Sequence, residues 1–278
     1  MSEQSPAHDP DADHPDLATL RAVCQPPHTL GRRNAEHWAG PLYLRRSSIH
    51  LTRALLPTGI SANGVTGVMI VVGLLGAAAL TLPGPPHTTG APGLLGPLLA
   101  AAGMQLQILL DCSDGEIARW RCRFSPAGVY LDRIAHYSTE AALPIALGVR
   151  ADGGFGALGG WTTVGALVAV LVLLIKAETD LVHVARAFAK RPLLSDDAAT
   201  AAPRAHGLAR LRATARAVPF NRAFVAIEFS LLALLAGLID LATGGLTGTH
   251  VLLIALVPAG LLTVAGHLAA VLSSSRLR

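Results

Sequence analysis

The stretch that decides the fold is GLLGPLLAAAGMQLQILLDCSDGEIAR, residues 93–119. Its first part, 93–110, has no charged residue and approaches the length of about 20 apolar residues that a membrane-spanning helix needs. Its second part places two aspartates and an arginine directly after this run, as Asp111, Asp114 and Arg119. Charged groups at the end of a spanning segment are costly and usually functional. The stretch therefore predicts a spanning helix that ends in a polar site.

The rest of the chain also has the composition of a membrane protein. Hydrophobic residues make up 51% of it and charged residues only 14%, against roughly 25% charged residues in soluble domains. The mean hydropathy of +0.48 agrees with this. We therefore predict an all-α polytopic membrane protein with about six transmembrane helices, at 63–82, 93–110, 127–149, 161–184, 223–243 and 249–272. Before them, 32–56 mixes arginine pairs with apolar residues, which predicts an amphipathic helix in the membrane interface.

The connections between these spans alternate in charge. Lys and Arg gather before the first span, after the second, after the fourth and at the C-terminus, whereas 83–92 and 243–249 have none. Arg150 is the one exception. The positive-inside rule then predicts a plasma (inner) membrane protein with its site and both termini in the cytoplasm. Residues 1–30, rich in Asp, Pro, Ala and His, predict a disordered cytosolic tail before a membrane domain over 31–278.

A second polar segment, GVYLDRIAH at 128–136, follows the first after a short basic link. Asp111 and Asp114 are three residues apart, and Asp132 and His136 are four apart, so each pair shares one face of its helix. The short link makes the two helices antiparallel neighbours, which brings these faces together. Three carboxylates there would repel one another unless a cation is bound, and oxygen ligands of this kind suit Mg²⁺ or Mn²⁺ beside substrate phosphates.

Small residues surround these acids. Gly115, Ala118 and Gly128 remove side-chain bulk where a large ligand would approach the backbone, and Arg119 can pair with a phosphate. Together with a cation, this combination predicts a diphosphate site. The competing interpretation is an ionic junction of two helices at the membrane surface. Three aligned acids with the glycines and the arginine favour the functional interpretation.

The combined pattern resembles that of the CDP-alcohol phosphatidyltransferases, DxxDGxxAR followed after eight residues by GxxxDxxxD. The matching residues are Asp111, Asp114, Gly115, Ala118, Arg119, Gly128 and Asp132. The resemblance implies an all-helical membrane enzyme of phospholipid synthesis that depends on a divalent metal. Its donor would be CDP-linked, either CDP-diacylglycerol or the CDP derivative of a small alcohol. CMP would leave as the hydroxyl of the acceptor attacks the β-phosphate.

The resemblance also assigns roles to residues. The implied metal ligands are Asp111, Asp114 and Asp132. Asn63 and Thr66 are similar to a polar pair that the family has at the start of its first span. The residues implied to accommodate the nucleotide are Gly115, Ala118, Arg119, Gly128, Asn63 and Thr66. Asp132 and His136 are the candidate catalytic residues. Membrane lipids and a second copy of the chain are the further partners that we expect, and no nucleic acid.

One residue departs from the family pattern, because its last Asp is His136 here. A neutral imidazole can accept a proton near pH 7, so His136 can serve as the base that activates the acceptor. Alternatively, the site has lost its base and binds nucleotide or lipid without turnover. A third role is that of a nitrogen ligand to the metal. A small transporter is the remaining alternative, suggested by ionisable residues such as Lys176 and Asp180 within a span.

Overall fold

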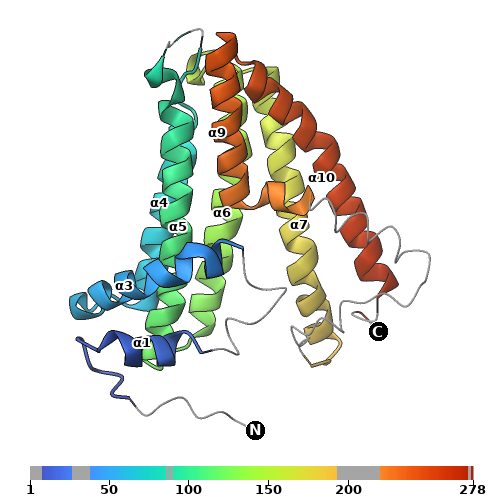
Figure 1. Ribbon diagram of the computed structural model, residues 1–278. Helices are drawn as coiled ribbons and strands as arrows, with labels where there is room; N and C mark the ends of the chain where they lie inside the picture. The colour runs from blue at the N-terminus through green and yellow to red at the C-terminus, as the bar shows by residue number, and fades with distance from the viewer. Residues whose placement is uncertain are drawn as a thin grey trace. The chain divides into compact units, whose positions relative to one another are not determined.

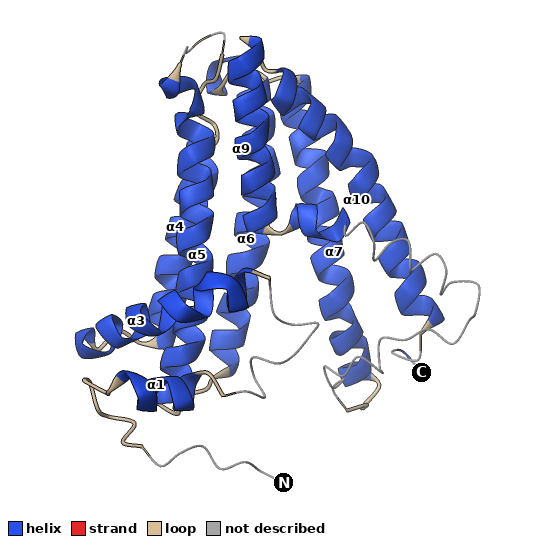
Figure 2. Cartoon of the chain, viewed as in Figure 1, coloured by secondary structure: helices blue, strands red, loops and turns tan. Residues whose placement is uncertain are grey.

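The computed structural model describes residues 8–26, 38–85, 87, 90–192, 220–274 and 277. Every regular element among these residues is a helix, and none is a strand (Figure 2). The longer helices are α1 (Leu17–Cys24), α3 (Arg45–Leu55), α4 (Ala62–Ala79), α5 (Leu95–Trp120), α6 (Pro126–Ala151), α7 (Gly160–Phe188), α9 (Ala226–Thr243) and α10 (Thr247–Ser273). Short helical turns lie between them at Gly40–Leu44, Leu56–Thr58, Ala91–Leu94, Phe155–Ala157 and Phe220–Phe224. The prediction of an all-α protein is confirmed.

Five of the described helices are long and apolar enough to cross a membrane, namely α4, α5, α7, α9 and α10. These five coincide with five of the predicted spans. The remaining predicted span, 127–149, falls on α6, which is as long as α5 but carries Asp132, His136, Glu140 and Arg150 along its length. The chain is therefore an integral membrane protein, and six remains an approximate number of spans.

The chain forms two compact units. The first comprises Met1–Gly73 and Gln105–His136, and the second comprises Leu74–Met104 and Tyr137–Arg278. The division falls within α4, α5 and α6. The motif at 111–119 and the motif at 128–136 belong entirely to the first unit.

The core of the first unit is built around the C-terminal half of α5. Ile117 and Trp120 of α5 are buried with Leu20 of α1, Ile49 of α3 and Met69 of α4. The short helix α3 precedes the first candidate span, within the segment for which an amphipathic helix was predicted. Figure 1 shows α1 and α3 near one end of α5. Residues 27–37, which include part of that predicted helix, lie outside the described residues.

The N-terminal segment differs from the disordered tail that its composition predicts. Within it, α1 begins at Leu17, and the side chain of Asp16 caps it by accepting hydrogen bonds from the backbone N–H groups of Ala18 and Thr19. Leu20, Val23 and Cys24 are buried in the core of the first unit. The prediction failed over residues 8–26 because few apolar residues suffice to fold a segment when a neighbouring core receives them.

In the second unit, α10 packs against α7 and α9, as Figure 1 also shows. Glycines allow close approach of the helices at several crossings. A Cβ atom at Gly165 of α7 would lie 2.3 Å from the carbonyl oxygen of Pro144 in α6, and one at Gly248 of α10 would lie 2.3 Å from the carbonyl oxygen of Ala236 in α9. The buried side chains of Leu143, Val168 and Leu253 belong to the same core.

The environment of Arg150 explains why this residue departs from the charge alternation of the connections. Its side chain is completely buried, and its guanidinium donates hydrogen bonds to the carbonyl oxygens of Leu82, at 2.7 Å, and Gly93, at 2.9 Å. Both carbonyls belong to the connection between α4 and α5. An arginine used in this way satisfies buried backbone acceptors, so it is not a free surface charge of the kind that the positive-inside rule counts.

Several ionisable residues of the spans in the second unit are paired. Lys176 of α7 lies 2.8 Å from the buried carboxylate of Glu140 on α6. The hydroxyl of Tyr137 donates to Asp180 at 2.8 Å, and His267 of α10 lies 3.1 Å from Glu178. Buried charges in membrane proteins commonly pair in this way. These interactions tie α6, α7 and α10 together.

Candidate active site

The site begins with the tight connection between α5 and α6. The backbone N–H groups of Cys122 and Arg123 donate to the carbonyl oxygens of Arg119 and Ala118, which closes the end of α5. Cys122 adopts the left-handed conformation that this type of helix end requires, with φ of 49°. Ser125 then caps α6 through a hydrogen bond from the N–H of Gly128, and Pro126 occupies the first turn, where its missing N–H has no consequence.

This connection brings three of the predicted residues into one cluster. One ligand atom from each of Asp111, Asp132 and His136 lies within 4.8 Å of the other two. Nε2 of His136 is 3.2 Å from Oδ1 of Asp111 and 3.5 Å from Oδ1 of Asp132. Adjacent ligands of an octahedral ion with bonds of about 2.1 Å are about 3 Å apart. Two carboxylates and an imidazole at this spacing fit a divalent cation, so the described residues contain a candidate metal site.

A cavity of about 290 Å³ opens beside this cluster. This volume is near the lower end of the range of about 300–1,000 Å³ that is typical of ligand pockets. Its lining comes from the first turns of α4, the end of α5 and the start of α6. The predicted site residues that line it are Asn63, Thr66, Asp114, Gly115, Ala118, Arg119, Gly128 and Asp132. Asp132 belongs to both the cavity wall and the cluster, so it joins the two.

Asp114 has a different environment from the three clustered residues. Its Oδ2 accepts a hydrogen bond of 2.6 Å from the hydroxyl of Thr66, and it lines the cavity. It does not belong to the group of Asp111, Asp132 and His136. Its charge nevertheless interacts with those of Asp111 and Asp132. The structure therefore places the three predicted acidic ligands in one region, with Asp114 fixed by α4.

The glycines keep the cavity open. A Cβ atom at Gly128 would lie 3.0 Å from Oδ1 of Asn63, and one at Gly115 would lie 3.3 Å from a terminal nitrogen of Arg119. Side chains at either position would press on residues that line the cavity. The guanidinium of Arg119 therefore lies beside the backbone of Gly115, where a ligand can reach both.

Arg119 is held from the side of the N-terminal segment. Its Nε donates a hydrogen bond of 2.6 Å to the carbonyl oxygen of Cys24, the last residue of α1. The thiol of Cys24 in turn lies 3.2 Å from the carbonyl oxygen of Glu116. Burial, with a smaller contribution from the charge of Glu116, raises the pKa of the Cys24 thiol to about 12. This thiol is therefore protonated and unreactive at neutral pH.

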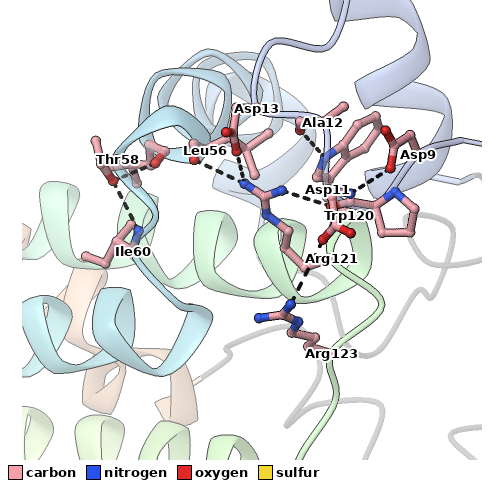
Figure 3. A network of polar contacts seen from close by, with 12 residues as sticks. Asp9, Asp11, Ala12, Asp13, Leu56, Thr58, Ile60, Trp120, Arg121 and Arg123 are labelled. Atoms are coloured by element: carbon pink, nitrogen blue, oxygen red, sulfur yellow. Dashed lines mark hydrogen bonds and ion pairs between the residues drawn. The ribbon is translucent and has the colours of Figure 1, made fainter.

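Two basic residues of the connection, Arg121 and Arg123, contact the N-terminal segment (Figure 3). Arg121 donates hydrogen bonds to the carbonyl oxygens of Pro10 and Leu56 and to the carboxylate of Asp13. Arg123 lines the cavity and lies 4.0 Å from Asp11, with both side chains largely exposed. Exposed ion pairs of this kind contribute little to the stability of a protein. Arg123 can therefore exchange Asp11 for an anionic ligand.

The sequence analysis did not identify the residues that hold Arg119 through the N-terminal segment and α3. These are Cys24, Gln25, Ser48, Thr52 and Glu116. Two signals point to them in retrospect. Glu116 lies inside the motif with no role of its own, and Ser48 and Thr52 are four residues apart, so they share one face of α3.

The comparisons with known proteins agree with this geometry. None of the curated proteins matches the chain. A family model described as CDP-alcohol phosphatidyltransferase matches residues 59–265, which is more than half of the chain and includes both motifs, the cluster and the cavity. The chain therefore belongs to the CDP-alcohol phosphatidyltransferase family, a family of transferases.

Proposed function

We propose that the chain transfers a phosphoalcohol group from a CDP-linked donor to an acceptor hydroxyl and releases CMP, in a metal-dependent reaction of phospholipid synthesis. The observation that carries the proposal is the adjacency of two features. A cluster of two carboxylates and an imidazole lies beside a cavity whose wall includes Arg119 and two glycines. A diphosphate needs such a combination of cation, arginine and accessible backbone.

In this proposal Asp111, Asp114 and Asp132 hold the cation. A bound Mg²⁺ or Mn²⁺ would neutralise charge on the diphosphate and stabilise the CMP leaving group. Thr66 orients Asp114 through its hydrogen bond. Arg119 donates to a phosphate oxygen from its terminal nitrogens, since only its Nε is engaged by Cys24. Gly115, Ala118, Gly128 and Asn63 leave space for the nucleotide.

His136 is the candidate base. The acceptor oxygen forms a bond to the β-phosphorus, the bond from that phosphorus to the CMP oxygen breaks, and the hydroxyl proton passes to Nε2 of His136. A base must present a free lone pair. The hydrogen bond between Nε2 and the carboxylate of Asp111 places a proton on Nε2, so that contact has to be released before transfer. The same proximity also supports the alternative role of a metal ligand.

The competing function is a silent binder of nucleotide or lipid. It would keep the cavity and the cluster but lack a group that activates the acceptor. His136 is a competent base at neutral pH, and its position within the cluster favours an active enzyme. A transporter has no comparable support, because the charges of the two motifs gather at the end of α5 and the start of α6, and the charges of Glu140 and Lys176 farther along α6 and α7 are paired with each other.

We further propose the setting of the reaction. The donor is CDP-diacylglycerol or the CDP derivative of a small alcohol, and the acceptor is an alcohol that presents a free hydroxyl. The protein lies in the plasma (inner) membrane with its site and both termini in the cytoplasm, surrounded by lipid partners. It functions as a homodimer. Residues 31–278 form the catalytic membrane domain, of which 59–265 match the family.

The first prediction concerns the metal. CMP release by the purified protein, measured with a panel of CDP donors and acceptors, is expected to stop with a chelator and to return with Mg²⁺ or Mn²⁺. Asp111→Asn is expected to abolish release, because it removes one carboxylate of the cluster. Asp152→Asn, which changes a carboxylate at the start of α7 that neither lines the cavity nor belongs to the cluster, is the matched control and is expected to retain metal-dependent CMP release. Undiminished turnover without metal would contradict the proposal.

A further inference from the structure

The N-terminal segment 8–25 is fastened to the end of α5 at two places. The first is drawn in Figure 3. The indole nitrogen of Trp120 donates to the carbonyl oxygen of Ala12 at 3.0 Å, and Arg121 contacts Pro10 and Asp13. Trp120 is almost completely buried. This end of the segment is therefore held by one large apolar contact and several charge-assisted hydrogen bonds.

The second place is the buried carboxylate of Glu116, which is completely inaccessible to solvent. Its Oε1 accepts hydrogen bonds from Gln25 at 2.8 Å and from Ser48 at 2.6 Å, and its Oε2 accepts one from Thr52 at 2.7 Å. A buried charge without such partners would be strongly unfavourable. Glu116 therefore connects α5 with the residue after α1 and with α3.

The second fastening leads to Arg119. Gln25 follows Cys24, and the carbonyl oxygen of Cys24 holds Nε of Arg119 at 2.6 Å. The two terminal nitrogens of Arg119 form no hydrogen bond or ion pair with any residue in the described part of the chain. They belong to a residue of the cavity wall. The segment thus fixes one edge of the guanidinium and leaves the other edge available for a ligand.

We propose that Glu116, through Gln25, Ser48 and Thr52, is a positioning residue that makes the N-terminal segment part of the donor site by holding Arg119 against the diphosphate. The inference rests on the proposed function. Its physical basis is the flexibility of arginine, whose side chain has a large rotamer entropy that must be lost on binding. A guanidinium already fixed at Nε loses less of this entropy when it meets a phosphate.

A positioning role and a merely structural role have different kinetic signatures. If Glu116 acts through Arg119 on donor binding, its loss raises KM for the donor while kcat and KM for the acceptor change little. If the network only stabilises the fold, its loss lowers the active fraction, which reduces kcat and leaves KM unchanged.

The experiment measures CMP release as a function of donor concentration for variants of the full chain. Glu116→Gln keeps the size of the side chain but removes its charge and replaces one acceptor oxygen by an amide donor, so the hydrogen bonds from Gln25, Ser48 and Thr52 cannot all be kept. We expect a rise in donor KM of about 10-fold, the lower end of what loss of a hydrogen bond to a charged group produces. Thr52→Val is the milder variant, which keeps the proposal testable if Glu116→Gln does not fold. Ser47→Ala, on the exposed face of α3, is the matched control.

A double-mutant cycle with Arg119→Lys decides whether Glu116 acts through Arg119. Lysine has no Nε to be held by Cys24 and cannot form the planar fork. We expect Glu116→Gln to raise donor KM in the wild-type background and to have little further effect in the Arg119→Lys background. Equal effects in both backgrounds would overturn the proposal.

A readout without nucleotide separates this inference from the proposed function. In a protein whose Cys112 and Cys122 are replaced by alanine, maleimide can modify Cys24 alone. The wild-type network buries this thiol, so we expect slow labelling, and labelling at least 10-fold faster in Glu116→Gln as the segment is released. Wild-type protein that releases no CMP, with Cys24 protected by Glu116, would overturn the function and support the docking. Active enzyme whose donor KM and Cys24 labelling do not respond to Glu116→Gln would overturn the inference alone.

Discussion

At the scale of single residues, the position of His136 matters most. Its Nε2 lies within 3.5 Å of carboxylate oxygens from both Asp111 and Asp132. A residue at this point can either accept a proton from the acceptor or share a cation with the two carboxylates. Under the proposed function, a histidine can therefore occupy a position where the family pattern has an aspartate.

Replacement of His136 distinguishes its roles. A base acts on the acceptor proton only in the transition state, so His136→Ala is expected to lower kcat by about 10²–10⁴-fold while donor binding changes little. His136→Asp restores the family pattern and is expected to retain part of the activity. Both are measured as CMP release and as binding of a CDP donor. Joint loss of metal and donor binding in His136→Ala would instead identify a ligand, and unchanged turnover would exclude both roles.

At the scale of the elements, Asp152 organises the start of α7. Its carboxylate accepts hydrogen bonds from the backbone N–H groups of Gly159, Trp161 and Thr162 and from the hydroxyl of Thr162. Partial burial raises the pKa of Asp152, but the hydrogen bonds from Thr162, Gly159 and Trp161 outweigh it. The pKa therefore lies below its ordinary value of 3.8. The ionised carboxylate is thus the form that caps the helix.

The capping predicts a pH-dependent stability. Because the pKa of Asp152 is lower in the folded state than in the unfolded state, its contribution is fully present above the unfolded value of 3.8 and is lost as pH falls through the folded pKa. Asp152→Asn is expected to be less stable by about 1 kcal/mol at pH 7, the usual size of a capping effect. The difference should shrink below about pH 4. Thermal unfolding in detergent across this pH range measures it, and a constant difference would contradict the assignment.

Close helix packing in the second unit supplies a further prediction. A Cβ atom at Gly165 would lie 2.3 Å from the carbonyl oxygen of Pro144 and 3.1 Å from the Cα of Gly148, so α6 and α7 would have to separate. Gly165→Ala is expected to destabilise the protein by about 1–3 kcal/mol. Gly266→Ala in α10 meets no atom within 4 Å and is the matched control, with an expected neutral or slightly stabilising effect. Similar melting temperatures for both variants would refute the close crossing.

The elements also show how far the sequence could predict the fold. The apolar runs predict α4, α5, α7, α9 and α10, because a run of about 20 apolar residues is typical of a membrane-spanning helix. α1 could not be predicted in the same way, since only Leu20, Val23 and Cys24 of its residues are buried, and their partners lie far away in the chain. The local signal was Asp16, a capping residue directly before a short apolar stretch.

The candidate site likewise has a part that the sequence predicts and a part that it does not. The spacing within the two motifs predicted that Asp111, Asp132 and His136 lie together, because helical periodicity and a short connection leave little freedom. The support of Arg119 by Cys24 and Glu116 depends on contacts between segments about 90 residues apart, which no local pattern reveals. Sequence periodicity thus brought together the side chains of the candidate site but missed those that hold Arg119.

At the scale of the whole molecule, the number of spans depends on α6. Five of the described helices are long and apolar enough to span, and an odd number of spans would place the two termini on opposite sides of the membrane. The charges of α6 do not exclude a span, because Glu140 is paired with Lys176 and the guanidinium of Arg150 donates hydrogen bonds to backbone carbonyl oxygens. A helix whose charges are satisfied internally can cross a bilayer. We therefore expect α6 to be the sixth span.

The last prediction uses the two ends of α6 to decide this. Cys122 is exposed just before α6, and Gly156 lies in the turn after it, with no atom near its Cβ position. With Cys112 replaced by alanine and Cys24 buried, a membrane-impermeant maleimide reports on one site at a time. In intact cells we expect it to label Gly156→Cys, in a chain that also carries Cys122→Ala, and to reach Cys122 only after the membrane is opened. If both sites behave alike, α6 does not span the membrane. If only Cys122 is labelled, α6 spans in the opposite direction, and the cavity that begins at Arg119 and Arg123 faces away from any CDP donor made in the cytoplasm. The positive charges of Arg121 and Arg123 oppose that outcome, since such residues are retained on the cytoplasmic side.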